Sequence, residues 1–384
     1  MTGRKRDDVV IVGAGVTGMS IAWHLARLGI HCTVVERTGV GAGMTSVQAG
    51  GVRTQWSSRL TCRLALESRA FYENVEKHLA PSVPPAFRAA GCAFVARTEE
   101  TLEVIAKRVV LQREEGVTSR TASPAELAGL LPGVRTDRVL GGAFNPVDGY
   151  FDRPASVVEA FAEAALREGQ TLVHAEVDRL EGDGDRWTVR LGDGSALTAG
   201  DVIAAVGCGT PDLLAATGVE VPIRRLPRFL FYSPPVAETC VPALIVFEDD
   251  ALLVKQLADG RLLAADLRYG LGGRRPSGDS CARIEADLRD LVALPSGARF
   301  TSIVEGEYDT TPDQQFLVGQ VPERPGLWMA AGLQGRGMML APVVGRMVAE
   351  ALEAGWSSTG AVPEELLPER FSGAGTGESE TQVI

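Results

Sequence analysis

The sequence has little of what metal, disulfide or membrane proteins require. Its 384 residues include only 4 histidines, and its 6 cysteines form no C-x-x-C pair, so neither a metal centre nor a disulfide frame is expected. It contains no apolar run of about twenty residues, and its basic start lacks the apolar stretch of a signal peptide. These absences predict a cytoplasmic protein with reduced thiols, no bound metal and no membrane span.

An excess of positive charge is also missing. The chain has 49 acidic and 38 basic residues, a net charge of −11, so nucleic acid is not an expected partner. Hydrophobic residues make up 45% and charged residues 23%, as in a soluble globular protein. The length suffices for two domains or one large interleaved pair. The oligomeric state is not indicated.

The most informative feature present is a strand–turn–helix pattern over residues 9–29. Gly13, Gly15 and Gly18 spell G-x-G-x-x-G, and a second strand ends in Glu36. Glycines at this spacing allow the tight turn, the close approach of a pyrophosphate and the packing of helix on strand, while an acid at this distance binds the ribose diol. The pattern predicts an adenine dinucleotide, with NADP disfavoured because Glu36 would repel a 2′-phosphate. The alternative is a glycine-rich turn in an unrelated α/β protein. The cofactor contacts expected here are Gly13, Gly15, Val16, Thr17, Gly18, Glu36 and Arg37, the last of these being equally typical of a solvated surface arginine.

A second glycine-rich loop, residues 332–337, has three glycines in six positions and precedes a helix expected over residues 341–354. Its small residues would let the backbone lie against a flat ring, and the helix N-terminus would stabilise negative charge on a reduced flavin. The alternative is a simple left-handed turn before a helix. A long Gly/Ala/Ser-rich loop, residues 39–53, is of the kind that usually carries function.

Three further segments, residues 46–58, 149–169 and 308–352, resemble the D-amino-acid oxidase/glycine oxidase/sarcosine oxidase superfamily of FAD enzymes. The combination of T-P-D with the later G-x-x-G-x-G is specific, and the resemblance covers residues 8–355. It implies a mixed α/β fold in which a Rossmann-type FAD-binding domain is interleaved with a substrate domain built on a large antiparallel sheet. The expected FAD segments are residues 1–85, 146–222 and 300–370, the substrate segments are 86–145 and 223–299, and residues 371–384 are an expected disordered tail.

The resemblance also implies which residues would hold the FAD. One stretch would follow the edge of the flavin, Val177 would read the adenine, and Gly207 would pack on the pyrophosphate. Gly306 stands where some relatives carry a cysteine, so the flavin is expected to be non-covalent. The remaining cofactor residues implied are Thr45, Ser46, Ala49, Gly50, Gly51, Gly332, Gln334, Gly335, Arg336, Gly337 and Met338.

The implied reaction is oxidation of an amine or amino acid, in which hydride passes to flavin N5 and the imine product hydrolyses, with O2 as the expected acceptor. Arg53 is the first candidate for the active site, either binding a substrate carboxylate or polarising the flavin; the alternative is a surface salt bridge. Lys255 would activate oxygen, unless it is merely a lysine at the end of a strand. Trp56 and Met339 replace the carboxylate clamp of sarcosine oxidases and suggest a more apolar pocket. Arg336, Tyr232, Arg228 and Arg268 are candidates to rebuild that clamp.

Other interpretations of the function remain open. The chain could be an amine dehydrogenase that passes electrons to another acceptor, or a non-catalytic flavin-binding subunit of a larger complex. A flavin monooxygenase is disfavoured because residues 331–334 lack the acid of the usual Gly-Asp ribityl motif. An NAD-dependent dehydrogenase would leave the second glycine-rich loop unexplained.

Overall fold

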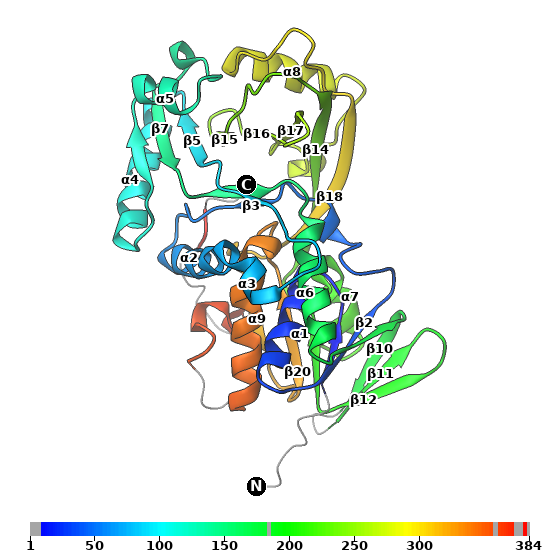
Figure 1. Ribbon diagram of the computed structural model, residues 1–384. Helices are drawn as coiled ribbons and strands as arrows, with labels where there is room; N and C mark the ends of the chain where they lie inside the picture. Colours follow the sequence, from blue (N-terminus) through cyan, green and yellow to red (C-terminus); the bar gives the residue numbers. More distant parts are fainter. Residues whose placement is uncertain (1–8, 183–185, 356–359, 372–378, 382–384) are drawn as a thin grey trace.

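The computed structural model describes residues 9–182, 186–355, 360–371 and 379–381, and the chain is organised around two large sheets (Figure 1). Figure 1 shows the eight-stranded sheet in the upper part of the molecule and the six-stranded sheet in the lower part. The chain crosses between them several times, as expected for interleaved domains. No helix in the described part of the chain is long and apolar enough to cross a membrane.

The six-stranded sheet has a parallel core. Its strands, in spatial order, are β19 (Leu317–Gln320), β20 (Leu327–Ala331), β13 (Asp201–Ala204), β1 (Val9–Val12), β2 (Cys32–Glu36) and β9 (Thr171–His174), with β19 the antiparallel edge. Helices α1 (Val16–Arg27), α6 (Ala155–Arg167) and α9 (Gly337–Ala354) cover one face. The other face carries α7 (Thr210–Ala215) and the meander β10 (Val177–Gly182), β11 (Trp187–Leu191) and β12 (Ala196–Ala199). Because both faces are covered, β1 reads as a continuous apolar run rather than an alternating one.

The eight-stranded sheet is antiparallel except where β15 runs parallel to β5. Its order is β18 (Ser302–Thr310), β14 (Arg224–Pro235), β17 (Arg261–Asp266), β16 (Leu252–Gln256), β15 (Leu244–Phe247), β5 (Cys92–Ala96), β7 (Gly141–Asn145) and β6 (Arg120–Ala122). Helices α5 (Pro124–Leu130) and α8 (Ser280–Leu291) pack on one face, and α4 (Glu99–Glu114) packs on part of the other. Side chains alternate along each strand, so Ile245 and Phe247 face α8 while Leu244 and Val246 face the opposite side.

A small third sheet joins the two parts. It consists of β3 (Gly51–Val52), β8 (Gly149–Phe151) and β4 (Phe87–Arg88). Helices α2 (Arg59–Glu73) and α3 (Val75–Leu79) lie between β3 and β4 in the chain. Short 3-10 helices include η1 (Met44–Ser46), η3 (Gly207–Gly209), η5 (Glu364–Leu366) and η6 (Pro368–Phe371).

The predicted fold class is confirmed. Three other predictions, on a domain boundary, the start of a helix and the C-terminal tail, differ from the structure. First, β18 lies in the range expected for the FAD domain, but it pairs along its whole length with β14 of the eight-stranded sheet. Second, α9 begins at Gly337 and not near Ala341. Pro342 has no N–H to donate to Met338 O, and the hydroxyl of Tyr72 donates to that carbonyl instead, so the helix extends past the proline.

The third correction concerns the expected tail. Residues 372–378 and 382–384 lie outside the described residues, so the prediction of disorder is not tested there. Glu380 is fully buried, and the prediction is wrong at this residue. Phe371 ends the 3-10 helix η6.

Candidate functional site

The first glycine-rich turn is built so that side chains cannot replace its glycines. Gly13 has φ +104°, and a Cβ there would lie 2.6 Å from Ala205 O. A Cβ on Gly18 would lie 2.0 Å from Gly13 O, so α1 can approach the turn only without one. The residue between them, Gly15, precedes the helix, and Val16 N donates to Thr45 Oγ1 at 3.2 Å. The free end of α1 therefore points N–H groups and a partial positive charge toward the segment that contains Thr45.

Glu36 ends β2 beside this turn. Its carboxylate accepts hydrogen bonds from Ala14 N at 2.9 Å and from Thr38 N at 2.8 Å. Partial burial acts to raise the pKa of Glu36, but these hydrogen bonds outweigh it and lower the pKa. A charged acceptor therefore lies at the carboxyl end of β2, next to the end of β1, where open α/β sheets bind dinucleotides.

The other residues expected near the adenine and pyrophosphate differ in setting. Gly207, with φ +53°, follows β13 and so lies at the same edge of the sheet. Val177 opens β10 and packs on the core beneath the meander. The side chain of Arg37 is 70% exposed and pairs with Glu176 at 3.3 Å, which favours the surface-arginine alternative.

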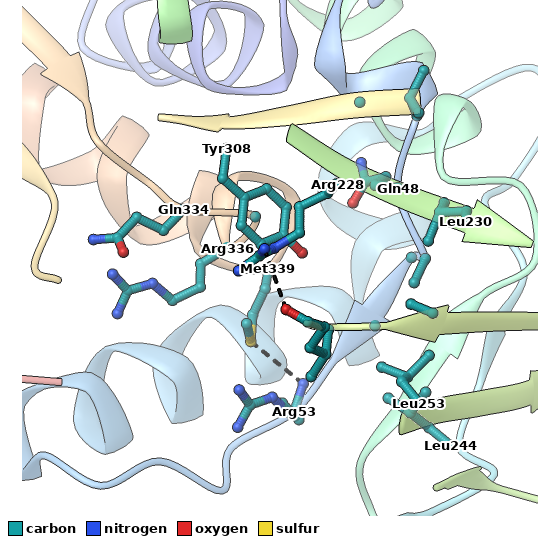
Figure 2. Close-up of a pocket in the computed structure, with 18 of the residues that line it drawn as sticks. Gln48, Arg53, Arg228, Leu230, Leu244, Leu253, Tyr308, Gln334, Arg336 and Met339 are labelled. Carbon is teal, nitrogen blue, oxygen red and sulfur yellow. Dashed lines mark hydrogen bonds between the residues drawn. The ribbon is translucent and has the colours of Figure 1, made fainter. Parts of the chain in front are cut away.

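A cavity, here called the inner cavity, lies between the six-stranded part and the face of the eight-stranded sheet that carries Leu244 (Figure 2). It brings together most of the residues predicted for the flavin ring and the active site. These are Ala49, Gly50, Gly51, Arg53, Trp56, Arg228, Gln334, Gly335, Arg336 and Met339. Figure 2 shows Tyr308, Arg228, Arg336 and Met339 close together at one end and Leu244 and Leu253 at the other. Thr45, Ser46, Gly332, Gly337 and Met338 lie in the adjoining loop and helix ends rather than in the wall.

The second glycine-rich loop is held by an acid that the sequence did not single out. Asp309 accepts hydrogen bonds from Gly332 N at 2.7 Å and Gln334 N at 3.0 Å. Gly332 has φ +73°, and a Cβ on Gly335 would lie 2.3 Å from the ring of Tyr308. The loop can therefore lie against Tyr308 only with glycine at position 335, and its small residues fit a surface for a planar ring.

Two arginines of the inner cavity, the buried Arg336 and the half-buried Arg228, form no salt bridge with an acid among the described residues. Arg336 is 2% exposed and donates to Leu333 O and Gln314 O, while its Nη1 has no hydrogen-bond partner among the described residues. Burial lowers the pKa of Arg336 to about 10. Arg228 donates to Tyr269 O at 2.9 Å, its Nε lacks a partner in the described structure, and burial lowers its pKa too. Because a buried unpaired cation is costly, this arrangement is suited to receiving an anion.

Arg53 and Trp56 form one wall of this site. Arg53 is 3% exposed, and its guanidinium lies 3.4 Å from the centre of the Trp56 ring. The guanidinium of Arg336 lies 5.5 Å from the same ring. Met339 contacts the start of this segment, because Arg53 N approaches its Sδ at 3.4 Å. Trp56 and Met339 thus line the cavity with apolar surface, as expected from the sequence.

A wider cavity of about 520 Å³, here called the outer cavity, adjoins the inner one, with which it shares Arg228, Leu267 and Gln334. Arg268 lines it, but its guanidinium bonds Asp266 at 2.8 and 2.9 Å, so its charge is already compensated. Of the candidates to rebuild a carboxylate clamp, Arg228 and Arg336 therefore retain the most capacity to bind an anion.

Two predicted catalytic residues do not line either cavity. Lys255 is 1% exposed, its Nζ donates to Phe151 O at 3.4 Å, and burial lowers its pKa to about 7. Leu253, two residues earlier on the same face of β16, lines the inner cavity instead. Tyr232 lies further along β14, with the guanidinium of Arg261 5.7 Å from its ring. A shift of two residues keeps the face of a strand but changes which side chain reaches the site.

The T-P-D motif has a structural role in the described chain. Asp313 pairs with Arg370 of η6 at 2.8 Å, with both side chains almost fully buried, and accepts from Gln315 N at 3.0 Å. The motif therefore anchors the segment before β19. Sequence reasoning missed Tyr308, Asp309 and Gln48 as site residues. The one available signal was Tyr308, which opens the Y-x-x-T-P-D run used for the resemblance.

Comparison with known proteins agrees with this geometry. A family model described as FAD dependent oxidoreductase matches residues 8–351. The chain is 28% identical over 381 residues to 4-methylaminobutanoate oxidase (formaldehyde-forming) of Paenarthrobacter nicotinovorans, covering 95% of this chain but 45% of that protein. It is 26% identical over 357 residues to glycine oxidase of Geobacillus kaustophilus (strain HTA426), covering 91% of this chain and 93% of that protein. The chain thus spans less than half the length of the first of these relatives.

Solved structures share the fold. L-proline dehydrogenase from P. horikoshii superposes with a TM-score of 0.87 at 22% identity, over 95% of this chain and 98% of that one. Glycine oxidase from Geobacillus kaustophilus gives 0.84 at 24% identity, over 94% and 98%. The resemblance inferred from the sequence is confirmed: the chain belongs to the family of FAD-dependent oxidoreductases, with FAD as its cofactor.

Proposed function

We propose that this enzyme oxidises the C–N bond of an amine that also carries a carboxylate. The observation that supports this most directly is the pair Arg228 and Arg336, which line one cavity with an unpartnered N–H each among the described residues. Charge-assisted bonds from guanidinium to carboxylate are short and strong, and their geometry fixes the orientation of the ligand. An amino acid or a longer amino-carboxylate would be held in this way.

The protein would contribute orientation and exclusion of water. Bound FAD would supply the acceptor for the hydride of the carbon next to the substrate nitrogen. Arg228 and Arg336 would hold the carboxylate, while Leu230, Leu244 and Leu253 would keep water from the reacting face. Holding the reactants in one geometry supplies much of the rate enhancement in such reactions. The imine product would then hydrolyse in water.

The names of two relatives support this substrate class. Glycine and 4-methylaminobutanoate each combine an amine with a carboxylate, at different separations. The outer cavity of about 520 Å³ offers space for a substrate longer than glycine. Trp56 and Met339 add apolar surface that would favour a substituted amine.

We further propose the cofactor contacts and the domain division. The residues at the first turn, at the edge of β3 and in the second loop would hold the FAD. The bond would be non-covalent, because Gly306, at the position where some relatives carry a cysteine, lines the inner cavity without a thiol. The FAD-binding domain would comprise residues 1–85, 146–222 and 311–370, because β18 belongs to the other sheet. The purified protein should be yellow, and acid or heat should release its flavin. A protein that stays colourless after reconstitution with FAD would contradict the proposal.

The electron acceptor would be O2 or another oxidant. The effect of replacing Lys255 on reoxidation by air tests which of the two is used. Its Nζ contacts Phe151 O, the atom that a Cβ on Gly50 would approach to 2.3 Å, so the amine lies directly behind the wall of the inner cavity. If Lys255 serves oxygen activation, Lys255→Met should slow reoxidation of the reduced enzyme by air far more than it slows reduction. Stopped-flow spectroscopy of the two half-reactions measures both. Equal effects on the two steps would remove Lys255 from this role, and slow reoxidation of the unaltered enzyme would identify a dehydrogenase.

A further inference from the structure

A carboxylate from the far end of the sequence lies close to residues that line the inner cavity. Glu380 is fully buried against the residues that precede α2. Its carboxylate accepts hydrogen bonds from Ser57 N at 3.1 Å, Ser58 N at 3.2 Å and Ser58 Oγ at 3.0 Å, and also from Ser57 Oγ. Thr381 N and Oγ1 bond Ser57 Oγ at 2.9 and 3.0 Å. A segment more than three hundred residues away in sequence is therefore bound at this point.

Glu380 lies close to residues that contact the arginines of the inner cavity. Ser57 directly follows Trp56, whose ring contacts the guanidinium groups of Arg53 and Arg336. Thr381 lines the outer cavity, as does Arg228. The carboxylate of Glu380 is thus placed next to residues that line the site in which we propose that a substrate carboxylate binds.

The charge of Glu380 acts on both buried arginines. Burial lowers the pKa of Arg336 to about 10, and Glu380, ahead of Asp309 and Asp313, opposes that shift. Burial also lowers the pKa of Arg53 to about 10, and Cys92 and then Glu380 oppose the shift. Glu380 therefore compensates part of the positive charge of this site.

We propose that Glu380 is an internal counter-ion that sets how tightly the site binds anionic ligands, and so takes part in selecting the substrate. A ligand carboxylate that enters beside Arg336 meets the negative charge of Glu380 as well as the positive charge of the arginines. Like charges in a partly dry site repel over several ångströms. Glu380 therefore weakens binding of small carboxylates, and ligands that keep their charge further from Ser57 are disfavoured less. This inference rests on the proposed carboxylate site but not on turnover.

The test uses the holoenzyme and acetate as the probe. Glu380→Gln keeps the size of the side chain and one oxygen acceptor but removes the charge. Acetate is titrated while the visible spectrum of the bound flavin is followed, and calorimetry gives the same Kd without relying on the flavin signal. We expect Glu380→Gln to bind acetate roughly three- to thirtyfold more tightly. Binding of acetamide, which is neutral, should change little.

Matched variants separate charge from structure. Glu380→Asp keeps the charge and should bind acetate with an affinity close to that of the unaltered protein. Glu380→Ala removes it and should tighten binding as Glu380→Gln does. Glu369→Gln removes a charge from the exposed Glu369 nearby in sequence and should have no effect.

Several results would overturn the proposal. It fails if acetate binds folded Glu380→Gln no more tightly than it binds the unaltered protein, if Glu380→Asp behaves like Glu380→Gln, or if no acetate binding is detected at all. The assay needs no amine. A protein that oxidises no amine but shows the expected tightening would contradict the proposed function while leaving this inference in place.

Discussion

Replacing Arg336 by methionine is the perturbation that the proposed substrate site predicts most sharply. The side chain is 2% exposed, its Nη1 lacks a partner among the described residues, and it lines the inner cavity. A substrate carboxylate would satisfy this group. Arg336→Met removes the donor and leaves the carboxylate in a partly dry cavity with Arg228 as its remaining charged partner of this kind.

The expected loss follows from the strength of such pairs. Truncating one partner of a buried, hydrogen-bonded charge pair costs about 2–5 kcal/mol, and each 1.4 kcal/mol is about tenfold in an equilibrium or rate constant. We therefore expect kcat/KM for an amino-carboxylate substrate to fall about 30-fold or more. Arg336→Lys keeps a charge but not the planar donor set, so its loss should be intermediate.

The assay compares two substrates in each variant. One is the amino-carboxylate and the other is the same amine with hydrogen in place of the carboxylate. Arg336→Met should lower kcat/KM for the first and change the second by less than about threefold. Arg268→Met is the control, because Arg268 lines the outer cavity but already bonds Asp266. Equal losses for both substrates in Arg336→Met would refute the assignment of the carboxylate to this arginine.

Three other predictions follow from separate parts of the molecule. Gly18→Ala should abolish FAD binding, measured by retention of flavin on gel filtration, because its Cβ would lie 2.0 Å from a backbone oxygen, whereas Gly43→Ala, with nothing within 4 Å of its Cβ, should bind FAD normally. Tyr72→Phe should lower the free energy of unfolding by about 1–3 kcal/mol, because the buried carbonyl of Met338 loses its hydroxyl donor; an unchanged urea midpoint would contradict this. Burial lowers the pKa of His24 to about 3, so the folded state keeps this group neutral, while the unfolded chain protonates it near the ordinary histidine pKa of 6.5. The contribution of His24 to stability is therefore complete above that pH and should fall by about 1–2 kcal/mol between pH 6.5 and 5, a loss that His24→Phe should reduce in denaturant titrations.

The sequence predicted the features that depend on local constraints. Gly13 and Gly18 are required because the turn has no room for a Cβ. Glycine is the one residue that meets this requirement, so the spacing of the glycines reveals the turn in the sequence. The fold class followed because the motifs of the family are spread over the whole chain. The second loop was found in the same way, since Gly332 and Gly335 both have positive φ.

The sequence could not predict features that depend on contacts between distant segments. Leu253 and not Lys255 lines the inner cavity, although the pleat of β16 puts both on one face, so periodicity alone cannot choose between them. The start of α9 was misplaced because Tyr72, far away in sequence, replaces the hydrogen bond that Pro342 cannot make. Glu380 lies in a Gly/Ser/Glu-rich stretch whose composition indicates disorder, yet its carboxylate is buried and accepts hydrogen bonds from Ser57 and Ser58.

The most direct test of the central claim is anaerobic reduction of the purified, FAD-loaded protein. Secondary amines, D- and L-amino acids and amino-carboxylates of increasing length are added in turn while the visible absorbance of the oxidised flavin is recorded. We predict that at least one amine that carries a carboxylate bleaches the flavin, and that the same amine without the carboxylate bleaches it more slowly or not at all. A flavin that stays oxidised with every member of the panel would contradict the account and would favour a non-catalytic flavin-binding subunit.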